Sequence, residues 1–226
     1  MLKYYYDLMS QPCRAIYIFL NKTKIPYEKC KVDLKSGEHL RGDFKDIHPF
    51  NLVPAINDSG FKLIESVAIL RYLCRKYPEY IDDHWYPQDV AKQALVDQYM
   101  EWQHSNIRFH GSLFFRHKIL IPMMTGDPPR ESSVERYRTG LESVLKQFED
   151  YWLKDSKFVA GQEISIADIL AVCELYQPAL AGYNVFTDHP RLSAWHELVK
   201  SELNPEFDEA NVIFNKLRAM QDLPKL

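Results

Sequence analysis

Residues 51–73 limit the possible folds more than any other stretch of the sequence. Two short apolar runs flank Asp58-Ser59-Gly60, a turn triplet of the kind that closes a β-hairpin. Glu65 and Ser66 follow the second run and open an apolar segment with helical spacing. The stretch therefore predicts strand, turn, strand and helix. Its polar pair falls where free helix N–H groups begin, a place suited to holding a small anion.

The residues before this stretch predict a small α/β unit. Residues 2–7 are rich in tyrosine and predict a strand, and the apolar run after Pro12 predicts a helix that begins at this proline. Residues 27–34 alternate apolar and charged side chains, as a half-exposed strand does. Residues 35–50 are polar and predict a loop with a weak helix. The order β-α-β, connection, β-hairpin and α describes a thioredoxin-like domain.

The rest of the chain predicts helices alone. Residues 78–88 contain two prolines and an acidic pair, which break the regular patterns and predict a linker. Ser165 and Asp168 have the spacing of a helix capping box. Helices are predicted over 89–117 (one long helix or a kinked pair), 134–151, 166–181, 190–202 and 206–219. We therefore expect an α+β protein with a thioredoxin-like domain (1–77), a linker (78–88) and an all-helical domain (89–226).

Composition argues for a small-molecule partner. The chain has 226 residues and is 46% hydrophobic, enough to fill two modest cores. Its net charge of −3 gives no electrostatic case for nucleic acid or an anionic membrane. No apolar run approaches the roughly 18 residues of a membrane span, and the first residues predict a strand in place of a signal segment. We expect a cytoplasmic protein.

The cysteines and histidines give no sign of a disulfide framework or a metal site. None of the four cysteines has C-x-x-C spacing, and the eight histidines are dispersed. Structural or free thiols fit this pattern best, and we expect no metal.

Ser10 and Cys13 have the spacing of a C-x-x-C redox motif with serine in the first place, directly after the first strand. A group at that position faces a helix N-terminus, which favours an anion. Ser10 could donate its O–H to a thiolate brought by a ligand, or it could simply end the strand or cap the helix. Cys13 lies one turn into the helix, so a reactive thiol at this position is a second possibility.

Three further features suit a peptide-like ligand. Pro54 after Val53 implies an edge strand, a kink or a cis bond, and a cis proline at this place in thioredoxin-like domains turns the preceding backbone toward a peptide ligand. Glu65 could pair with a ligand amine and Ser66 with its carboxylate, although a simple N-cap is the alternative. His39 is a candidate for a second ligand carboxylate or an ordinary surface histidine.

Six motifs, taken together, resemble the glutathione S-transferases, with the similarity greatest to the theta class. They cover nearly the whole chain in order and with matching separations. They are YYDLMSQPCRA (5–15), VPAI (53–56), ESVAILRYL (65–73), YPQD (86–89), WQHSNIR (102–108) and SIAD (165–168).

This resemblance implies the glutathione-transferase fold, a cytosolic homodimer and glutathione as cosubstrate. By the family's pattern, Ser10 hydrogen-bonds the glutathione sulfur and His39 reaches the glycyl carboxylate. The Val53 backbone pairs with the cysteinyl unit beside a cis Pro54. The γ-glutamyl amine and carboxylate are held by Glu65 and Ser66.

Arg108 resembles a theta-class arginine that lies near the sulfur or the electrophile. Without the resemblance it would be a solvated helix residue. The implied activity is conjugation of glutathione to small hydrophobic electrophiles, namely alkyl or arylalkyl halides and epoxides, with organic hydroperoxides as further substrates. The alternatives are a thiol transferase that uses Cys13, and a non-catalytic ligand-binding or assembly protein on the same fold.

The end of the sequence departs from the class pattern. Theta-class chains often carry a further C-terminal helix over the active site, whereas this sequence stops at residues 222–226. We therefore expect a more open electrophile pocket.

Overall fold

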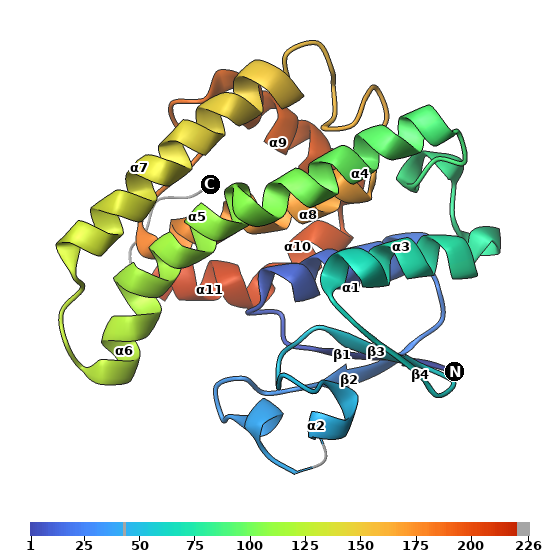
Figure 1. Ribbon diagram of the computed structural model, residues 1–226, viewed down its shortest axis with the longest axis horizontal. Coiled ribbons are helices and arrows are strands. Elements are labelled where there is room, and N and C mark those ends of the chain that lie inside the picture. Colours follow the sequence, from blue (N-terminus) through green and yellow to red (C-terminus); the bar gives the residue numbers. More distant parts are fainter. Residues whose placement is uncertain (43, 221–226) are drawn as a thin grey trace.

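The computed structural model describes residues 1–42 and 44–220, and it has a small sheet domain followed by a helical domain (Figure 1). The sheet has the strand order β2-β1-β3-β4. β1 (Leu2–Tyr6) pairs parallel with β2 (Glu28–Lys31) and antiparallel with β3 (Ala55–Asp58), and β3 pairs antiparallel with β4 (Phe61–Ile64). The predicted α+β fold class is confirmed.

The hairpin β3–β4 is closed by the predicted turn. Ser59 and Gly60 have positive φ values of 53° and 102°, the conformation that two-residue hairpin turns require. Ala55 faces both Tyr5 on β1 and Ile64 on β4. This register brings the end of β1, the start of β3 and the end of β4 to one end of the sheet.

Helices cover both faces of the sheet. α1 (Gln11–Thr23) and α3 (Ser66–Lys76) lie on one face and α2 (Phe44–Ile47) on the other (Figure 1). Successive side chains of β1 point to opposite faces. Accordingly the Tyr4 hydroxyl donates to the Cys13 carbonyl of α1 over 2.7 Å, while the Tyr5 ring lies 6.3 Å from Phe44 of α2.

The predicted strand over residues 27–34 is too long. β2 ends at Lys31, although the Val32 N–H still donates to Tyr6 over 2.8 Å. After Val32, two carboxylates bind backbone N–H groups that strand pairing would otherwise use. Asp7 accepts the N–H of Leu34, and Asp33 accepts that of Lys35. A side chain that binds backbone N–H groups competes with strand pairing. The alternation of apolar and charged residues, on which the prediction rested, does not reveal this competition.

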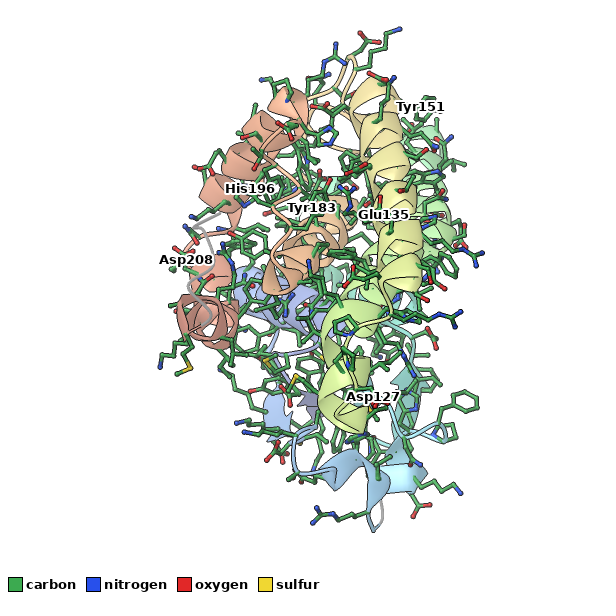
Figure 2. The ribbon with its side chains drawn as sticks, turned by 90° about the vertical axis from the view of Figure 1, so that its left-hand side faces the viewer. Asp127, Glu135, Tyr151, Tyr183, His196 and Asp208 are labelled. Atoms are coloured by element: carbon green, nitrogen blue, oxygen red, sulfur yellow. The ribbon has the colours of Figure 1, made fainter. Side chains whose placement is uncertain are left out.

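The helical domain contains eight α-helices within the described residues. They are α4 (Val90–Ser105), α5 (Ile107–Phe115), α6 (Ile121–Thr125), α7 (Glu131–Gln147), α8 (Ile166–Tyr176), α9 (Pro190–Leu203), α10 (Glu206–Ala210) and α11 (Val212–Met220). Figure 2 shows α7, which carries Glu135, and α9, which carries His196, on either side of the segment with Tyr183.

Asparagines interrupt two of the predicted helices. Of the two alternatives predicted over 89–117, the structure has the pair of helices, with its break at Asn106. The Asn106 side-chain amide donates to the Trp102 carbonyl over 2.7 Å. Asn211 divides the predicted helix 206–219 into α10 and α11, and its amide donates to the Phe207 carbonyl over 2.8 Å. In both places a short side chain bonds to the carbonyl four residues earlier, which disturbs the helix ladder.

α8 is the buried central helix, and the predicted capping box at its start is confirmed. The Ser165 hydroxyl accepts the Ala167 N–H over 3.3 Å, and the Asp168 carboxylate accepts the Ser165 N–H over 2.9 Å. Asp168 is fully buried and also accepts from the Val159 N–H and the Trp195 indole N–H. Burial raises the pKa of Asp168, while these hydrogen bonds act in the opposite direction.

Residues 78–88 contain two 3₁₀ turns, Pro78–Tyr80 and Asp83–Trp85, between α3 and α4. The domain limits placed at this segment stay a prediction. The end of the sequence, on which the expectation of an open electrophile pocket depends, lies outside the described residues. In the described ranges, the helices are all too short or too polar to cross a membrane.

Candidate active site

Ser10 lies between β1 and α1, at the N-cap position of α1. Its backbone is extended, with φ −83° and ψ 126°, and its N–H donates to the Asp7 carbonyl over 3.0 Å. Among residues 1–42 and 44–220, Ser10 makes no side-chain capping hydrogen bond to the helix. The half-buried hydroxyl is therefore at a helix N-terminus without serving as its cap.

Cys13 is buried inside α1. Burial raises the pKa of its thiol to about 11, although a hydrogen bond with Ser10 acts in the opposite direction. The thiolate, and not the thiol, is the nucleophile in sulfur chemistry. Cys13 is thus both inaccessible and protonated at neutral pH, and the structure gives no support to a thiol transferase that uses it.

Val53 and Pro54 lie immediately before β3. The peptide bond between them is cis, as the family resemblance implies. Pro54 is buried, and Val53 is half-buried immediately before the ladder that β3 forms with β1 and β4. By the strand register, this dipeptide lies beside the end of β1 that leads to Ser10.

Glu65 and Ser66 follow β4 and open α3. Glu65 occupies the N-cap position with φ 70° and ψ 113°, and its side chain is exposed. A glutamate with positive φ stores strain of about 1–3 kcal/mol, a feature that is frequent at functional sites. In the described part of the chain, no side-chain capping bond is found for it, so the simple N-cap interpretation does not hold. Ser66 is buried as the first residue of the helix.

Arg108, on α5, is not a freely solvated residue. Its Nη1 pairs with the Glu174 carboxylate of α8, and the side chains of Arg108 and Glu174 are 37% and 2% exposed. The Glu174 carboxylate raises the pKa of Arg108, with smaller contributions from Glu65 and Cys13. The guanidinium is thus fixed to α8 through one nitrogen and remains partly exposed.

His39 comes from a different segment of the chain. It belongs to a short 3₁₀ turn, Glu38–Leu40, in the loop that leaves β2, and it is half-buried. Its Nδ1 atom is buried and has no hydrogen-bond partner within the described residues. β2 runs parallel to β1, so this loop starts at the same end of the sheet as Ser10.

The sequence analysis did not identify two buried charged residues that lie where the sheet domain packs against the helical domain. Arg14 is fully buried and crosses from α1 to α8, and Glu174 is the partner of Arg108. Each stands in an apolar run that was predicted to be a helix. A charged residue inside an apolar helical run is almost never buried without a partner. The position of Arg14 and Glu174 in such runs could therefore have identified both as members of a buried polar contact.

All four cysteines lie in described segments, and each is a free thiol. The structure places no three metal-ligating side chains together within the residues that it describes. The expectation that the protein needs no metal stays a prediction.

Comparison with known proteins establishes the family. The model of the glutathione S-transferase N-terminal domain matches residues 1–75, and that of the C-terminal domain matches residues 114–202. The solved structures of similar fold are also glutathione transferases. The chain belongs to the glutathione S-transferase family.

Its relatives include theta-class enzymes. The chain is 42% identical to glutathione S-transferase theta-1 of Rattus norvegicus over 219 residues, which cover 96% of this chain and 90% of that protein. It is 40% identical to the Homo sapiens theta-1 enzyme, with the same coverage. The solved structure of apo human glutathione S-transferase T1-1 superimposes with a TM-score of 0.91 at 40% identity, covering 97% of this chain and 91% of that one.

A second solved structure, human glutathione transferase theta-2 in complex with glutathione and an unknown ligand, has a TM-score of 0.90 at 39% identity. It covers 99% of this chain and 93% of its own. The predicted membership of the theta-like group is therefore confirmed, and the similarity supports glutathione transfer as the general activity of the chain.

Proposed function

We propose that this protein conjugates the thiolate of glutathione to small hydrophobic electrophiles, namely alkyl or arylalkyl halides and epoxides, and also reduces organic hydroperoxides with glutathione. The observation that carries the proposal is Ser10 at the N-terminus of α1, with a hydroxyl that does not cap the helix. Two solved relatives add support: human theta-2 is described in complex with glutathione, and a human theta-class enzyme with the glutathione conjugate of 1-menaphthyl sulfate.

The arrangement at the end of the sheet suits a tripeptide. In the proposed complex the γ-glutamyl amine pairs with Glu65, and its carboxylate binds at Ser66, where α3 begins. The backbone of Val53 pairs with the cysteinyl unit beside cis Pro54. The sulfur then lies toward Ser10, because the end of β1 is next to the start of β3. His39, in the loop from the neighbouring strand, binds the glycyl carboxylate.

Activation of the sulfur needs no general base. A thiol with a pKa of about 8.5 is only about 3% ionised at pH 7, and lowering its pKa to about 6.5 gives roughly 75% thiolate. That shift requires roughly 2.7 kcal/mol. A hydrogen bond from Ser10 to the charged sulfur supplies about 1.5 to 3 kcal/mol, and the helix N-terminus about 0.3 to 1 kcal/mol.

Arg108 has a separate role in this proposal. Its guanidinium is fixed to Glu174 and remains partly exposed. A cation at this place stabilises negative charge on the sulfur or on the departing group of the electrophile as the bond to carbon breaks.

Replacement of Ser10 by alanine tests the proposal. We expect Ser10→Ala to lower kcat/KM with glutathione and an alkyl or arylalkyl halide by roughly 10- to 100-fold, as loss of a hydrogen bond to a charged group does. Ser201→Ala, an exposed serine of α9, is the matched control. Equal rates for Ser10→Ala and the wild type would remove the role assigned to this residue.

A panel of halides, epoxides and hydroperoxides then defines the substrate class. Retention on immobilised glutathione without turnover of any of them would favour a non-catalytic carrier instead. We further propose that the protein works as a cytosolic homodimer. Size-exclusion chromatography with light scattering measures its molar mass in solution and so checks the oligomeric state.

A further inference from the structure

Two arginines and one carboxylate meet where the sheet domain joins the helical domain. Arg14 comes from α1, Arg108 from α5 and Glu174 from α8, which packs against both of those helices. Arg14 is fully buried, Glu174 is nearly so, and Arg108 lies at the edge. The family roles considered above use Arg108 alone.

Glu174 depends on Arg108. A carboxylate at this depth has lost its hydration and needs a cation or several hydrogen-bond donors in return. Within the described chain, its one hydrogen-bonded partner is the Nη1 group of Arg108, and Arg14 lies near enough for the charge of Glu174 to raise its pKa. Burial by itself lowers the pKa of Arg14 and is the larger effect.

Arg108 depends on Glu174 in turn. A guanidinium carries five N–H donors in a rigid plane. One nitrogen of Arg108 is held by Glu174, and the guanidinium makes no other hydrogen bond to the described residues. Its long side chain therefore has a single fixed point, and the donors that remain are available to a ligand in the site.

The same turn of α8 also holds the loop that carries Ser10. The Nη2 group of Arg14 donates to the Cys173 carbonyl over 3.3 Å and to the Gln177 side chain over 3.1 Å. Its Nη1 group donates to the carbonyls of Leu8 and Met9 over 3.0 and 3.3 Å. Residues 173–177 thus fix both Arg108 and the backbone immediately before Ser10 on one rigid support.

We propose that Glu174 is a positioning residue for glutathione transfer: it sets the guanidinium of Arg108 at a fixed place relative to the hydroxyl of Ser10. The inference rests on the proposed function. Glu174 touches neither glutathione nor electrophile in this role. It acts through Arg108, and its effect falls on the chemical step, where a misplacement of about 1 Å costs up to about 100-fold in rate.

Glu174→Gln tests this role, because it keeps the size of the side chain and removes its charge. We expect kcat to fall roughly 10- to 100-fold while KM for glutathione changes by less than about twofold, since other residues bind the tripeptide. Glu174→Asp keeps the carboxylate and should recover part of kcat. Glu142→Gln, which removes one of the two carboxylate partners of Arg138 in an exposed ion-pair cluster on α7, is the matched control and should leave both constants unchanged.

A double-mutant cycle separates positioning from general support of the fold. In an Arg108→Ala background, Glu174→Gln should change kcat by less than about twofold, because the group that it positions is already absent. Additive losses in the two backgrounds would overturn the proposal, and so would an unchanged kcat in Glu174→Gln. If Glu174→Gln does not fold, as judged by circular dichroism, the cycle is run with Glu174→Asp and is read in the same way.

The outcome also distinguishes this inference from the proposed function. If Ser10→Ala and Arg108→Ala lower turnover but Glu174→Gln matches the wild type, only the positioning role fails. If Ser10→Ala and Arg108→Ala both retain wild-type turnover, the proposed function fails and the positioning role fails with it.

Discussion

The two ends of α8 hold buried carboxylates in different ways. Asp168, in the first turn, is surrounded by uncharged donors: the N–H groups of Val159 and Ser165 and the indole of Trp195. Glu174, in the last turns, pairs with the guanidinium of Arg108. Both side chains are almost wholly removed from solvent. Burial alone therefore does not mark a functional carboxylate. The two residues differ in the kind of partner, which is uncharged for Asp168 and a cation for Glu174.

Replacement of Asp168 should have the largest effect on stability. Asp168→Ala leaves three buried N–H donors without their acceptor, and each costs about 1–3 kcal/mol. We expect the free energy of unfolding to fall by about 3–5 kcal/mol in urea denaturation. KM for glutathione in the protein that remains folded should stay unchanged. A loss below about 1 kcal/mol would contradict the structural role, and a specific loss of kcat would remove the distinction between the two ends of the helix.

His196 is a third buried ionisable group, and it lies against the end of α8. The acid beside it, Glu197, has an exposed side chain. His196, on α9 (Figure 2), is 2% exposed. Its ring lies 5.3 Å from that of Tyr176 and 4.2 Å from that of Phe186. Burial lowers its pKa to about 4, although the nearby Glu197 acts in the opposite direction. Between pH 6.5 and 4 the unfolded chain therefore binds a proton that the folded chain does not.

The sign of the pH effect follows from this difference. The contribution of His196 to stability is complete above pH 6.5 and is lost as the pH falls toward 4. We expect a loss of about 2–3 kcal/mol between pH 7 and pH 4.5 in the wild type, and a smaller loss in His196→Gln. Urea denaturation at the two pH values measures both. Parallel losses in the two proteins would show that other groups control acid stability.

The smallest expected effect on stability concerns the packing of α5 against α7. A Cβ added to Gly140 of α7 would lie 2.2 Å from Nδ1 of His110 on α5, so the two helices can approach only because this residue is glycine. Alanine normally stabilises a helix by about 1 kcal/mol relative to glycine. We expect Gly140→Ala to destabilise the wild type by about 1–2 kcal/mol, and to stabilise the His110→Ala variant. Stabilisation in both backgrounds would show that the close approach is unimportant. The check is thermal unfolding of the four proteins.

Local patterns were sufficient to predict most of the fold. The turn at Ser59-Gly60 and the capping box of Ser165 and Asp168 were correct because the interacting groups are within a few residues of each other. The strand predicted over 27–34 was too long because its end depends on Asp7, 27 positions before Leu34. The periodicity of side chains contains no information on such a contact.

For the candidate site, too, local features were predicted from the sequence and contacts between distant residues were not. Ser10, Val53-Pro54 and Glu65-Ser66 were identified at strand ends, and the strand register does bring these positions to one end of the sheet. Their roles toward glutathione stay predictions. The ion pair of Arg108 with Glu174 spans 66 positions, and the bond of Arg14 to Gln177 spans 163. The packing of α8 against α5 and against α1 creates these contacts, so the sequence alone indicated only that the charges needed partners.

The buried bridge made by Arg14 also limits how the molecule can move. Its guanidinium is bound at one end to the loop at Leu8 and Met9 and at the other to α8. A hinge motion that parted the domains would leave an unpaired charge in an apolar interior, which is strongly unfavourable. The two domains should therefore behave as one rigid body during turnover. The backbone before Ser10 and the end of α8 that binds Arg108 then keep their relative positions before any ligand arrives.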